Sequence, residues 1–250
     1  NVSEQIDLIA GGQFGYVDRP DFNRTDAMFN YNNYPQFEET SWRTYLRLTQ
    51  SFANSEDQSG ISNVFYSIQL AYSEDDRKIA DDKFGDDHFK YGYYGEYDRK
   101  RAPNYQFETD SVNGVEEEAF FQQGFRDTAV DFTPAAINDV PSNYTEQLYD
   151  FTDGDVQTLQ YIAGQGGLRN GDAPQFVYNL WNNVGNTPGS YFQDERQTFR
   201  ASADGSFDIG EHTISLGVQY EQIVRRAYSL ASRSLWTIGR QSVNSHIRQL

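Results

Sequence analysis

The chain contains no cysteine and only three histidines among its 250 residues. It can therefore form no disulfide, no thiolate metal site and no cysteine nucleophile. A cysteine-free chain fits the cytosol, the periplasm or a bacterial surface, and so selects none of them. His88, His212 and His246 are far apart in sequence, and we interpret them as structural. The sequence also lacks a glycine-rich phosphate loop, GxSxG and HExxH, so we predict that the chain is not an enzyme.

Basic residues are scarce as well. The 20 Lys and Arg are outnumbered by 37 Asp and Glu, and the net charge is −17. This balance argues against nucleic acid as a partner, because phosphates attract cationic proteins. It also disfavours a basic patch on an anionic leaflet. Aromatic residues, in contrast, make up 16% of the chain, which a globally disordered protein would lack.

Long apolar runs are missing too. No stretch of about 18 apolar residues exists, so the sequence predicts no transmembrane helix. Residues Asn1–Ala10 have neither the basic region nor the apolar core of a secretory signal. Neither absence excludes the outer membrane, because the strands of a transmembrane barrel are short and only half apolar. The chain starts and stops without a structural boundary, so we expect it to be a segment of a longer protein.

Alternation of apolar and polar residues predicts two β-hairpins, at 41–74 and 194–228. In the second hairpin, two alternating runs flank the polar turn GSFDIGEH at 205–212. The first hairpin has the same plan, with its turn at 53–61. One face of each hairpin is apolar and the other polar. The apolar positions are Trp42, Leu46, Leu48, Val64, Tyr66, Ile68, Leu70, Tyr72, Phe199, Ala201, Ala203, Ile214, Leu216, Val218 and Tyr220.

Long connections separate the hairpins. We interpret residues 1–40, 75–193 and 229–250 as loops, with weak helical spacing at 144–149 and 156–163, and Phe89–Tyr97 as a candidate strand pair. Short turns then lie on one side and long loops on the other, as in transmembrane β-barrels with short periplasmic turns and longer extracellular loops. The predicted fold is therefore all-β, with antiparallel strands forming part of an outer-membrane barrel that carries a long extracellular loop.

The two faces of these strands then acquire opposite roles. The apolar face would meet lipid, with Trp42, Tyr66, Tyr72 and Tyr220 placed near strand ends as an aromatic girdle. The polar face would line a lumen. Its predicted lumen-facing residues are Arg43, Arg47, Arg200, Gln219 and Glu221.

A family resemblance supports this prediction. The stretch GEHTISLGVQYEQ at 210–222 resembles a pattern repeated in the barrels of TonB-dependent outer-membrane receptors. Residues 178–222 and 234–247 resemble the large Oar-like members from Bacteroidetes. The resemblance covers the last third of the chain and the hairpin at 41–74.

The resemblance implies a barrel of about twenty-two strands with an N-terminal plug. It implies energised import of a bulky nutrient, such as a glycan, a peptide or a metal chelate, across the bacterial outer membrane. The expected partners are outer-membrane lipid, TonB acting through a plug outside this segment, and a surface lipoprotein. The chain departs from the family in showing four predicted strands, no plug and no TonB box, and four strands cannot close a barrel.

Two sets of side chains are candidate binding residues. Tyr91, Tyr93, Tyr94, Trp181 and Trp236 could stack on a sugar or peptide, although for most of them packing within the loop is the favoured interpretation. Asp150, Asp153 and Asp155 flank Gly154 and could offer oxygen ligands to Ca²⁺. The EF-hand spacing is absent, so a solvated acidic turn is the favoured interpretation there. We expect no other cofactor.

Two other kinds of protein remain open. One is an outer-membrane barrel that exports proteins or mediates adhesion. The other is a glycan-binding surface β-sandwich, in which the apolar faces pack between two sheets. In a barrel, by contrast, the apolar faces point outward and remain exposed in the isolated chain. Exposure of these faces therefore distinguishes the sandwich from the barrel.

Overall fold

A computed structural model describes residues 6–52, 60–152, 156–176 and 178–247. The chain divides into two compact units, each assembled from three stretches. The first unit contains Asn1–Arg19, Gln36–Ile79 and Phe192–Ser229, and the second contains Pro20–Pro35, Ala80–Tyr191 and Leu230–Leu250. Most of the structure is antiparallel β-sheet, as the sequence predicts.

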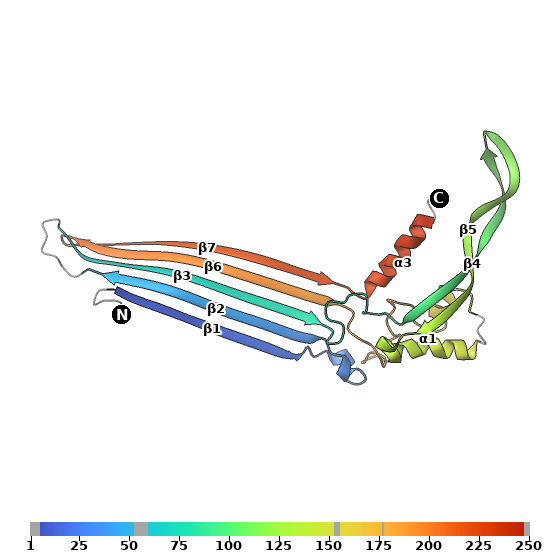
Figure 1. Ribbon diagram of the computed structural model, residues 1–250, viewed down its shortest axis with the longest axis horizontal. Coiled ribbons are helices and arrows are strands. Elements are labelled where there is room, and N and C mark those ends of the chain that lie inside the picture. The colour runs from blue at the N-terminus through green and yellow to red at the C-terminus, as the bar shows by residue number, and fades with distance from the viewer. Residues whose placement is uncertain (1–5, 53–59, 153–155, 177, 248–250) are drawn as a thin grey trace. The chain divides into compact units, whose positions relative to one another are not determined.

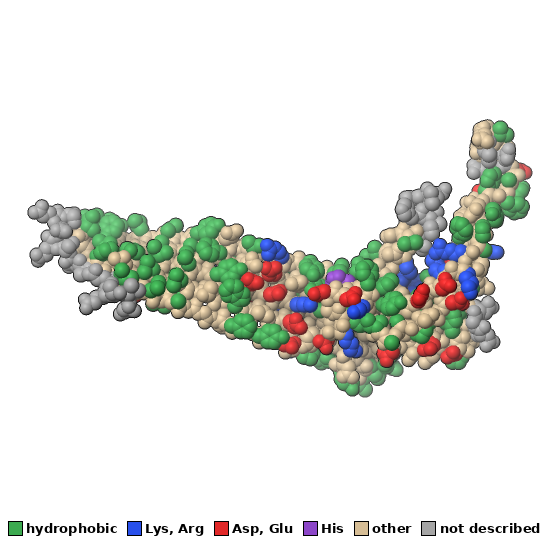
Figure 2. Space-filling view, viewed as in Figure 1, with side chains coloured by type: hydrophobic (Ala, Val, Ile, Leu, Met, Phe, Trp, Pro, Cys, Tyr) green, Lys and Arg blue, Asp and Glu red, His purple; other side chains and the backbone are tan. Residues whose placement is uncertain are grey.

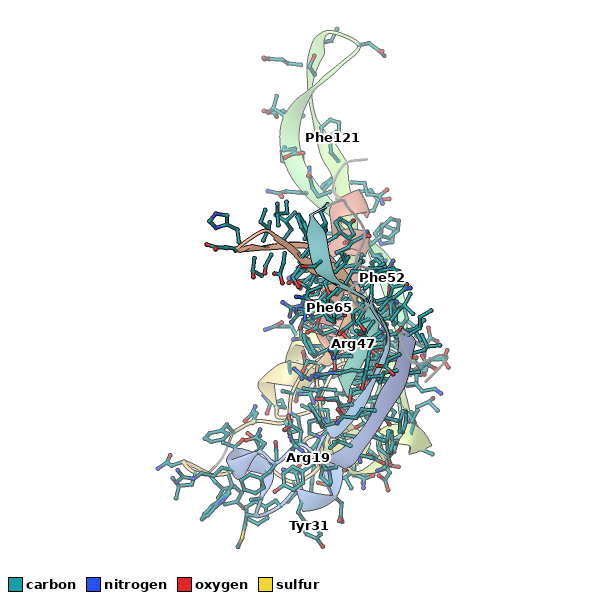
Figure 3. The ribbon with its side chains drawn as sticks, turned by 90° about the vertical axis from the view of Figure 1, so that its left-hand side faces the viewer. Arg19, Tyr31, Arg47, Phe52, Phe65 and Phe121 are labelled. Carbon is teal, nitrogen blue, oxygen red and sulfur yellow. The ribbon has the colours of Figure 1, made fainter. Side chains whose placement is uncertain are left out.

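The first unit is a five-stranded sheet with the order β1-β2-β3-β6-β7. It is a single curved layer when viewed along the strands, where Phe52 and Phe65 are labelled (Figure 3). Its strands are β1 (Ile6–Pro20), β2 (Gln36–Ser51), β3 (Ile61–Ala80), β6 (Tyr191–Ile209) and β7 (His212–Leu230).

Both predicted hairpins are present, and they are neighbours in one sheet. Strand β3 pairs with β6 in antiparallel register from Ile61 opposite Ile209 to Ile79 opposite Phe192. The turn between β6 and β7 is shorter than predicted, because the strands continue to Ile209 and resume at His212. Gly210 has a φ of 60°, a conformation that suits a tight hairpin turn. Most of the other predicted turn, 53–59, lies outside the described residues.

The interpretation of 1–40 as a loop is wrong for β1. Gly11, Gly12 and Gly15 suggest a loop in the sequence, but in the structure they lie in β1 and allow β2 to approach closely. A Cβ atom at Gly11 would lie 2.5 Å from the Tyr45 ring, and one at Gly15 would lie 2.8 Å from the Ser41 hydroxyl. Missing side chains at these positions also hid the alternation of the strand from the sequence.

The directions of the strands place the short turns and the longer connections at opposite ends of the sheet. Strands β1, β3 and β7 run one way and β2 and β6 the other (Figure 1). The two hairpin turns therefore lie at one end of the sheet. The two longer connections, β1–β2 and β3–β6, and the segment that follows β7 start from the opposite end, in agreement with the predicted asymmetry.

The second unit shows that 75–193 and 229–250 are not loops. It contains the hairpin β4 (Gly95–Val112) and β5 (Val115–Pro134). Its α-helices are α1 (Asp139–Phe151), α2 (Leu159–Gly164) and α3 (Ser234–Ile247). Short 3-10 helices, η1 (Arg24–Asp26), η2 (Tyr31–Asn33) and η3 (Ala136–Asn138), complete it.

Local patterns identified only part of this unit. The helical spacing at 144–149 falls within α1, and that at 156–163 overlaps α2. The strand pair predicted at Phe89–Tyr97 is wrong, because only Gly95–Tyr97 is strand and its partner is β5.

The second unit has its own core. Val130, Leu148, Val156 and Ile162 form a buried cluster against which Tyr97, Tyr149 and Leu159 pack. The amide of Val130 donates to the carbonyl of Val156 at 2.8 Å. Because these residues come from a strand, a loop and two helices, no single local period marks them in the sequence.

Polar contacts join the three stretches of this unit. From the β1–β2 connection, the Asn30 amide donates to the carbonyl of Asn183 at 2.8 Å. Nearby, the Asn182 amide donates to an Asp26 carboxylate oxygen at 2.7 Å. From α3, the Trp236 indole donates to the carbonyl of Phe89 at 3.2 Å. The two shorter stretches are thus packed onto the longest one.

Candidate functional site

The polar face of the sheet carries the residues predicted to face a lumen. Arg47 donates to Gln69 at 2.6 Å, and Arg200 donates to Glu221 at 2.6 Å (Figure 3, which labels Arg47). Arg43 lines a hollow of about 400 Å³ with the Arg200–Glu221 pair. Gln219 alternates with Glu221 along β7 and therefore shares this face. The common face is confirmed, whereas the lumen stays a prediction.

A row of aromatic rings crosses the opposite face. The rings of Trp42 and Tyr72 are 4.9 Å apart, Tyr72 is paired with Phe199, and the rings of Phe199 and Tyr220 are 6.5 Å apart. We call this set the aromatic row. It runs across β2, β3, β6 and β7, and it contains three of the four residues predicted for the girdle, Trp42, Tyr72 and Tyr220.

The aromatic row separates a charged part of this face from an uncharged part. Toward the long connections, Tyr72 bonds to Glu74 at 3.0 Å and Arg226 bonds to Glu195 at 3.3 Å. Toward the short turns, alternate positions of the described strands hold no Asp, Glu, Lys or Arg. They include Leu46, Leu48, Ile68, Leu70, Ala201, Ala203, Ile214, Leu216 and Val218. We call these residues the apolar band.

The apolar band is exposed. Leu216 and Val218 are each 68% exposed, and Leu46, Ile68 and Leu70 are exposed to more than two fifths. On the face drawn in Figure 2, charged side chains over the sheet gather near the long-connection end, and green side chains lie among uncharged tan surface over the rest of the sheet. A continuous exposed apolar surface of this kind marks contact with lipid or another protein.

The second unit holds a separate cavity. It has a volume of about 660 Å³ and adjoins a second hollow of about 340 Å³. The two hollows share five lining residues, so we treat them as one arginine–tryptophan cavity. The shared residues are Arg99, Leu159, Arg169, Trp236 and Arg240.

Guanidinium groups dominate the charge of this cavity. Asp127 accepts from Arg99 at 2.6 Å and lies 3.5 Å from Arg101.

The second carboxylate of the cavity is shared in the same way. Asp172 accepts from Arg169 at 2.8 Å and from Arg240 at 3.4 Å. Burial lowers the pKa of Arg240, Asp172 opposes that shift, and the neighbouring charge of Arg169 reinforces it. Each of these two carboxylates thus lies between two guanidinium groups. A third carboxylate, that of Glu96, also lines the cavity, so the four arginines exceed the acids by one charge.

Aromatic rings form the other wall. Trp236 stacks on Tyr93 with ring centres 5.4 Å apart and meets Phe89 edge-on at 5.7 Å. Both Trp236 and Tyr93 line the cavity, so the structure brings together two of the five predicted ligand-stacking residues. Trp181 is half-buried and does not line this cavity.

Tyr91 and Tyr94 are structural, so their prediction as ligand-stacking residues is wrong. Both side chains are fully buried. The Tyr91 hydroxyl donates to the carbonyl of Gly85 at 2.8 Å and accepts from the amide of Asp81 at 3.0 Å. The Tyr94 hydroxyl donates to the carbonyl of Asp172 at 2.6 Å. Neither ring can reach a ligand without unfolding its surroundings.

The candidate calcium site is only partly described. Asp150 is exposed near the end of α1, and Asp153 and Asp155 lie outside the described residues. Within the described part of the chain, no group of three or more His, Asp or Glu is arranged to hold a metal ion.

The sequence interpretation missed the arginines of the cavity. They come from β4, from the segment after α2 and from α3, so no motif contains them. One signal was present, since Arg99, Lys100 and Arg101 form a basic run in a strongly acidic chain. The simplest interpretation of such a run is a strand exposed to solvent, so the sequence alone does not indicate a binding site there.

Comparison with known proteins found no family model, no curated protein and no solved structure that matches the chain. Among the helices that the structure describes, none has the length and apolar character needed to cross a membrane. The function must therefore be argued from the two surfaces described above.

Buried tyrosines predict an alkaline limit to the stability of the second unit. Burial raises the pKa of Tyr91 and of Tyr149 from 10.0 to about 12. Because the unfolded chain ionises first, the stabilisation is complete below pH 10 and is lost as pH rises from about 10 to 12. Tyrosinate absorbance should therefore rise together with the loss of near-ultraviolet circular dichroism. Full ionisation of the folded unit at pH 10 would contradict this expectation.

Proposed function

We propose that the chain forms part of the wall and of the ligand-receiving surface of an energised outer-membrane transporter of the TonB-dependent class. The cargo would be a bulky nutrient such as a glycan, a peptide or a metal chelate. The observation that carries the proposal is the exposed apolar band, uncharged and bordered by the aromatic row. A lipid-facing barrel wall has this arrangement of an apolar band and an aromatic girdle.

The height of the band supports lipid as its partner. From Ile61 to Tyr72, β3 extends roughly 35–40 Å at about 3.3 Å per residue. At a strand tilt of about 40°, that length spans approximately 25–30 Å along the membrane normal, close to the apolar height of outer-membrane barrels. The aromatic row then lies at one membrane interface, and the charged residues beyond it lie in water.

The opposite face fits a polar passage. Arg43, Arg47 and Arg200 are accompanied by Gln69 and Glu221, so this face presents hydrogen-bonding groups along the wall. Five strands cannot enclose a passage of this kind, so the proposal requires further strands pairing with β1 and β7. It also requires a plug that engages TonB, and it allows a surface lipoprotein to assist.

The long connections supply the receiving surface. In this proposal they lie outside the cell, where a folded unit with a cavity would bind cargo before its passage. Binding sites are commonly carried by loops on a rigid scaffold, which is the relation between these connections and the sheet.

A glycan-binding sandwich is less well supported. In a glycan-binding sandwich the apolar residues would be covered by a second sheet, whereas Leu216 and Val218 are each 68% exposed. Export and adhesion would use the same lipid-facing wall, and they differ from import in the use of energy.

Cell fractionation followed by an uptake assay tests the proposal. The protein should remain in the outer-membrane fraction after carbonate washing and should require detergent for extraction. Cargo accumulation should stop when an uncoupler collapses the proton gradient. Recovery of the protein in a detergent-free soluble fraction would refute the membrane wall, and uncoupler-resistant accumulation would refute energised import.

A further inference from the structure

We infer that the arginine–tryptophan cavity binds a carboxylate-bearing saccharide, with the carboxylate on the guanidinium groups and the sugar ring on Trp236. Binding is argued from the cavity alone. The further statement that this saccharide is cargo rests on the function proposed above.

The excess of positive charge calls for an anion. Arg99, Arg169 and Arg240 line the cavity together with the carboxylates of Asp127 and Glu96. Next to this lining, Asp172 pairs with Arg169 and Arg240, and Arg101 lies near Asp127, so four guanidinium groups stand against three carboxylates. The side chains of Arg169 and Arg240 are only 25% and 24% exposed, so water screens their charges incompletely.

The arginines are also held in place before a ligand arrives. Arg169 donates to both oxygens of Asp172, and Arg240 donates to the carbonyl of Asn170 as well as to Asp172. A guanidinium presents five donors in a planar fork, so each group keeps donors beyond those used by its carboxylate. Planar pairing of that fork with an incoming carboxylate favours a carboxylate over a neutral group.

The aromatic wall selects a ligand with a flat apolar face. Tyr93 supports Trp236 by stacking, and the indole N–H is occupied by the carbonyl of Phe89, so the ring is fixed. A fixed aromatic ring binds with little loss of side-chain entropy. A pyranose presents C–H groups on one face and hydroxyls around its edge.

The polar rim suits the hydroxyl groups of a saccharide. Thr158, Gln160 and Thr237 line the same cavity, and their side chains keep hydrogen-bonding capacity beyond the bonds that they accept from Tyr161, Arg169 and Arg240. The volume of about 660 Å³ lies within the range of roughly 300–1,000 Å³ that is usual for small-ligand pockets. A uronic acid, which combines a carboxylate with a pyranose ring, meets all of these features.

Calorimetric titration of the detergent-solubilised protein with oligogalacturonate tests the inference. The matched probe is the same oligosaccharide with its carboxylates methyl-esterified. We expect the acid to bind at least about tenfold more tightly than the ester, with an affinity that falls as salt concentration rises. Equal binding of acid and ester, or binding of neither, would overturn the inference.

Variants locate the binding to the cavity. Trp236→Phe and Arg240→Lys should each weaken acid binding at least about fivefold while the near-ultraviolet circular dichroism shows that the unit remains folded at the temperature of the titration. Trp181→Phe is the matched control, because Trp181 does not line the cavity, and its affinity should equal that of the wild type. An effect of Trp181→Phe equal to that of Trp236→Phe would place the site elsewhere.

A titration with a peptide tests whether the cavity prefers a peptide carboxylate to a saccharide carboxylate. A short peptide with a free C-terminus is compared with its C-terminal amide in the same titration. Tighter binding of the free peptide than of oligogalacturonate would overturn the assignment to a saccharide. Acid-selective binding without uptake by cells would leave the cavity assignment standing and refute only the transport function.

Discussion

Substitution of Leu216 by arginine is expected to destabilise the folded sheet in lipid. Leu216 lies in the apolar band and is 68% exposed, so in the proposed barrel wall the arginine would meet hydrocarbon. An arginine on the lipid face near the midplane costs about 2–4 kcal/mol. This cost corresponds to a decrease of roughly 30- to 700-fold in the folding equilibrium. Urea unfolding of the protein in lipid vesicles measures the change.

Gln219→Arg is the matched control for this experiment. It places the same side chain on the same strand, β7, but on the face that carries Arg200 and Glu221. Its unfolding free energy should stay within about 0.5 kcal/mol of the wild type. Equal losses for the two variants would contradict the assignment of the two faces.

Substitution of Gly171 by valine is expected to detach α3 from the second unit and destroy the arginine–tryptophan cavity. Gly171 has a φ of 89°, a conformation that a β-branched residue adopts only with strain. Its added Cβ would lie 2.7 Å from the Cβ of Trp236 and 2.9 Å from the carbonyl of Arg233. Backbone strain and overpacking together should cost more than about 3 kcal/mol. Thermal unfolding, followed by near-ultraviolet circular dichroism, measures this cost.

Gly164→Ala serves as the control for the glycine substitution. A Cβ at Gly164, the last residue of α2, meets no atom within 4 Å. The variant should therefore unfold at the wild-type temperature and keep its affinity for acidic saccharide. A wild-type melting temperature in Gly171→Val would show that α3 does not pack against Gly171.

The sheet could be predicted because its chemistry repeats every second residue. Alternation in β3 and β7 reports which side chains share a face, and the bonds from Arg47 to Gln69 and from Arg200 to Glu221 confirm that assignment. Strand β1 was missed because glycines at 11, 12 and 15 replace side chains where Tyr45 and Ser41 approach closely. Apolar–polar alternation is therefore not visible in a strand whose glycines leave space for side chains of the neighbouring strand.

The second unit could not be predicted from local patterns, because its stabilising contacts join distant parts of the chain. Val130 and Val156 meet in its core, and Asn30 bonds to Asn183. Such contacts have no sequence period. The two helices that the sequence did indicate, α1 and α2, overlap the stretches with helical spacing at 144–149 and 156–163.

The candidate cavity was anticipated in its aromatic part and missed in its charged part. Composition singled out Tyr93 and Trp236, but it singled out the buried Tyr91 and Tyr94 equally, because burial is a property of the fold. Asp172 pairs with both Arg169 and Arg240. This arrangement forms only because α3, which carries Arg240, packs against the segment after α2, which carries Arg169 and Asp172. Sequence order gives no sign of that approach.

The central claim is that the apolar band faces lipid. The absence of cysteine allows single reporters, so Leu216→Cys and Ser215→Cys are each labelled with an environment-sensitive fluorophore in the protein reconstituted into vesicles. Nitroxide-bearing lipids should quench the label at 216 strongly and the label at 215 weakly, and aqueous iodide should show the opposite order. Iodide quenching of both labels, with no quenching of either by the lipid nitroxide, would contradict the claim.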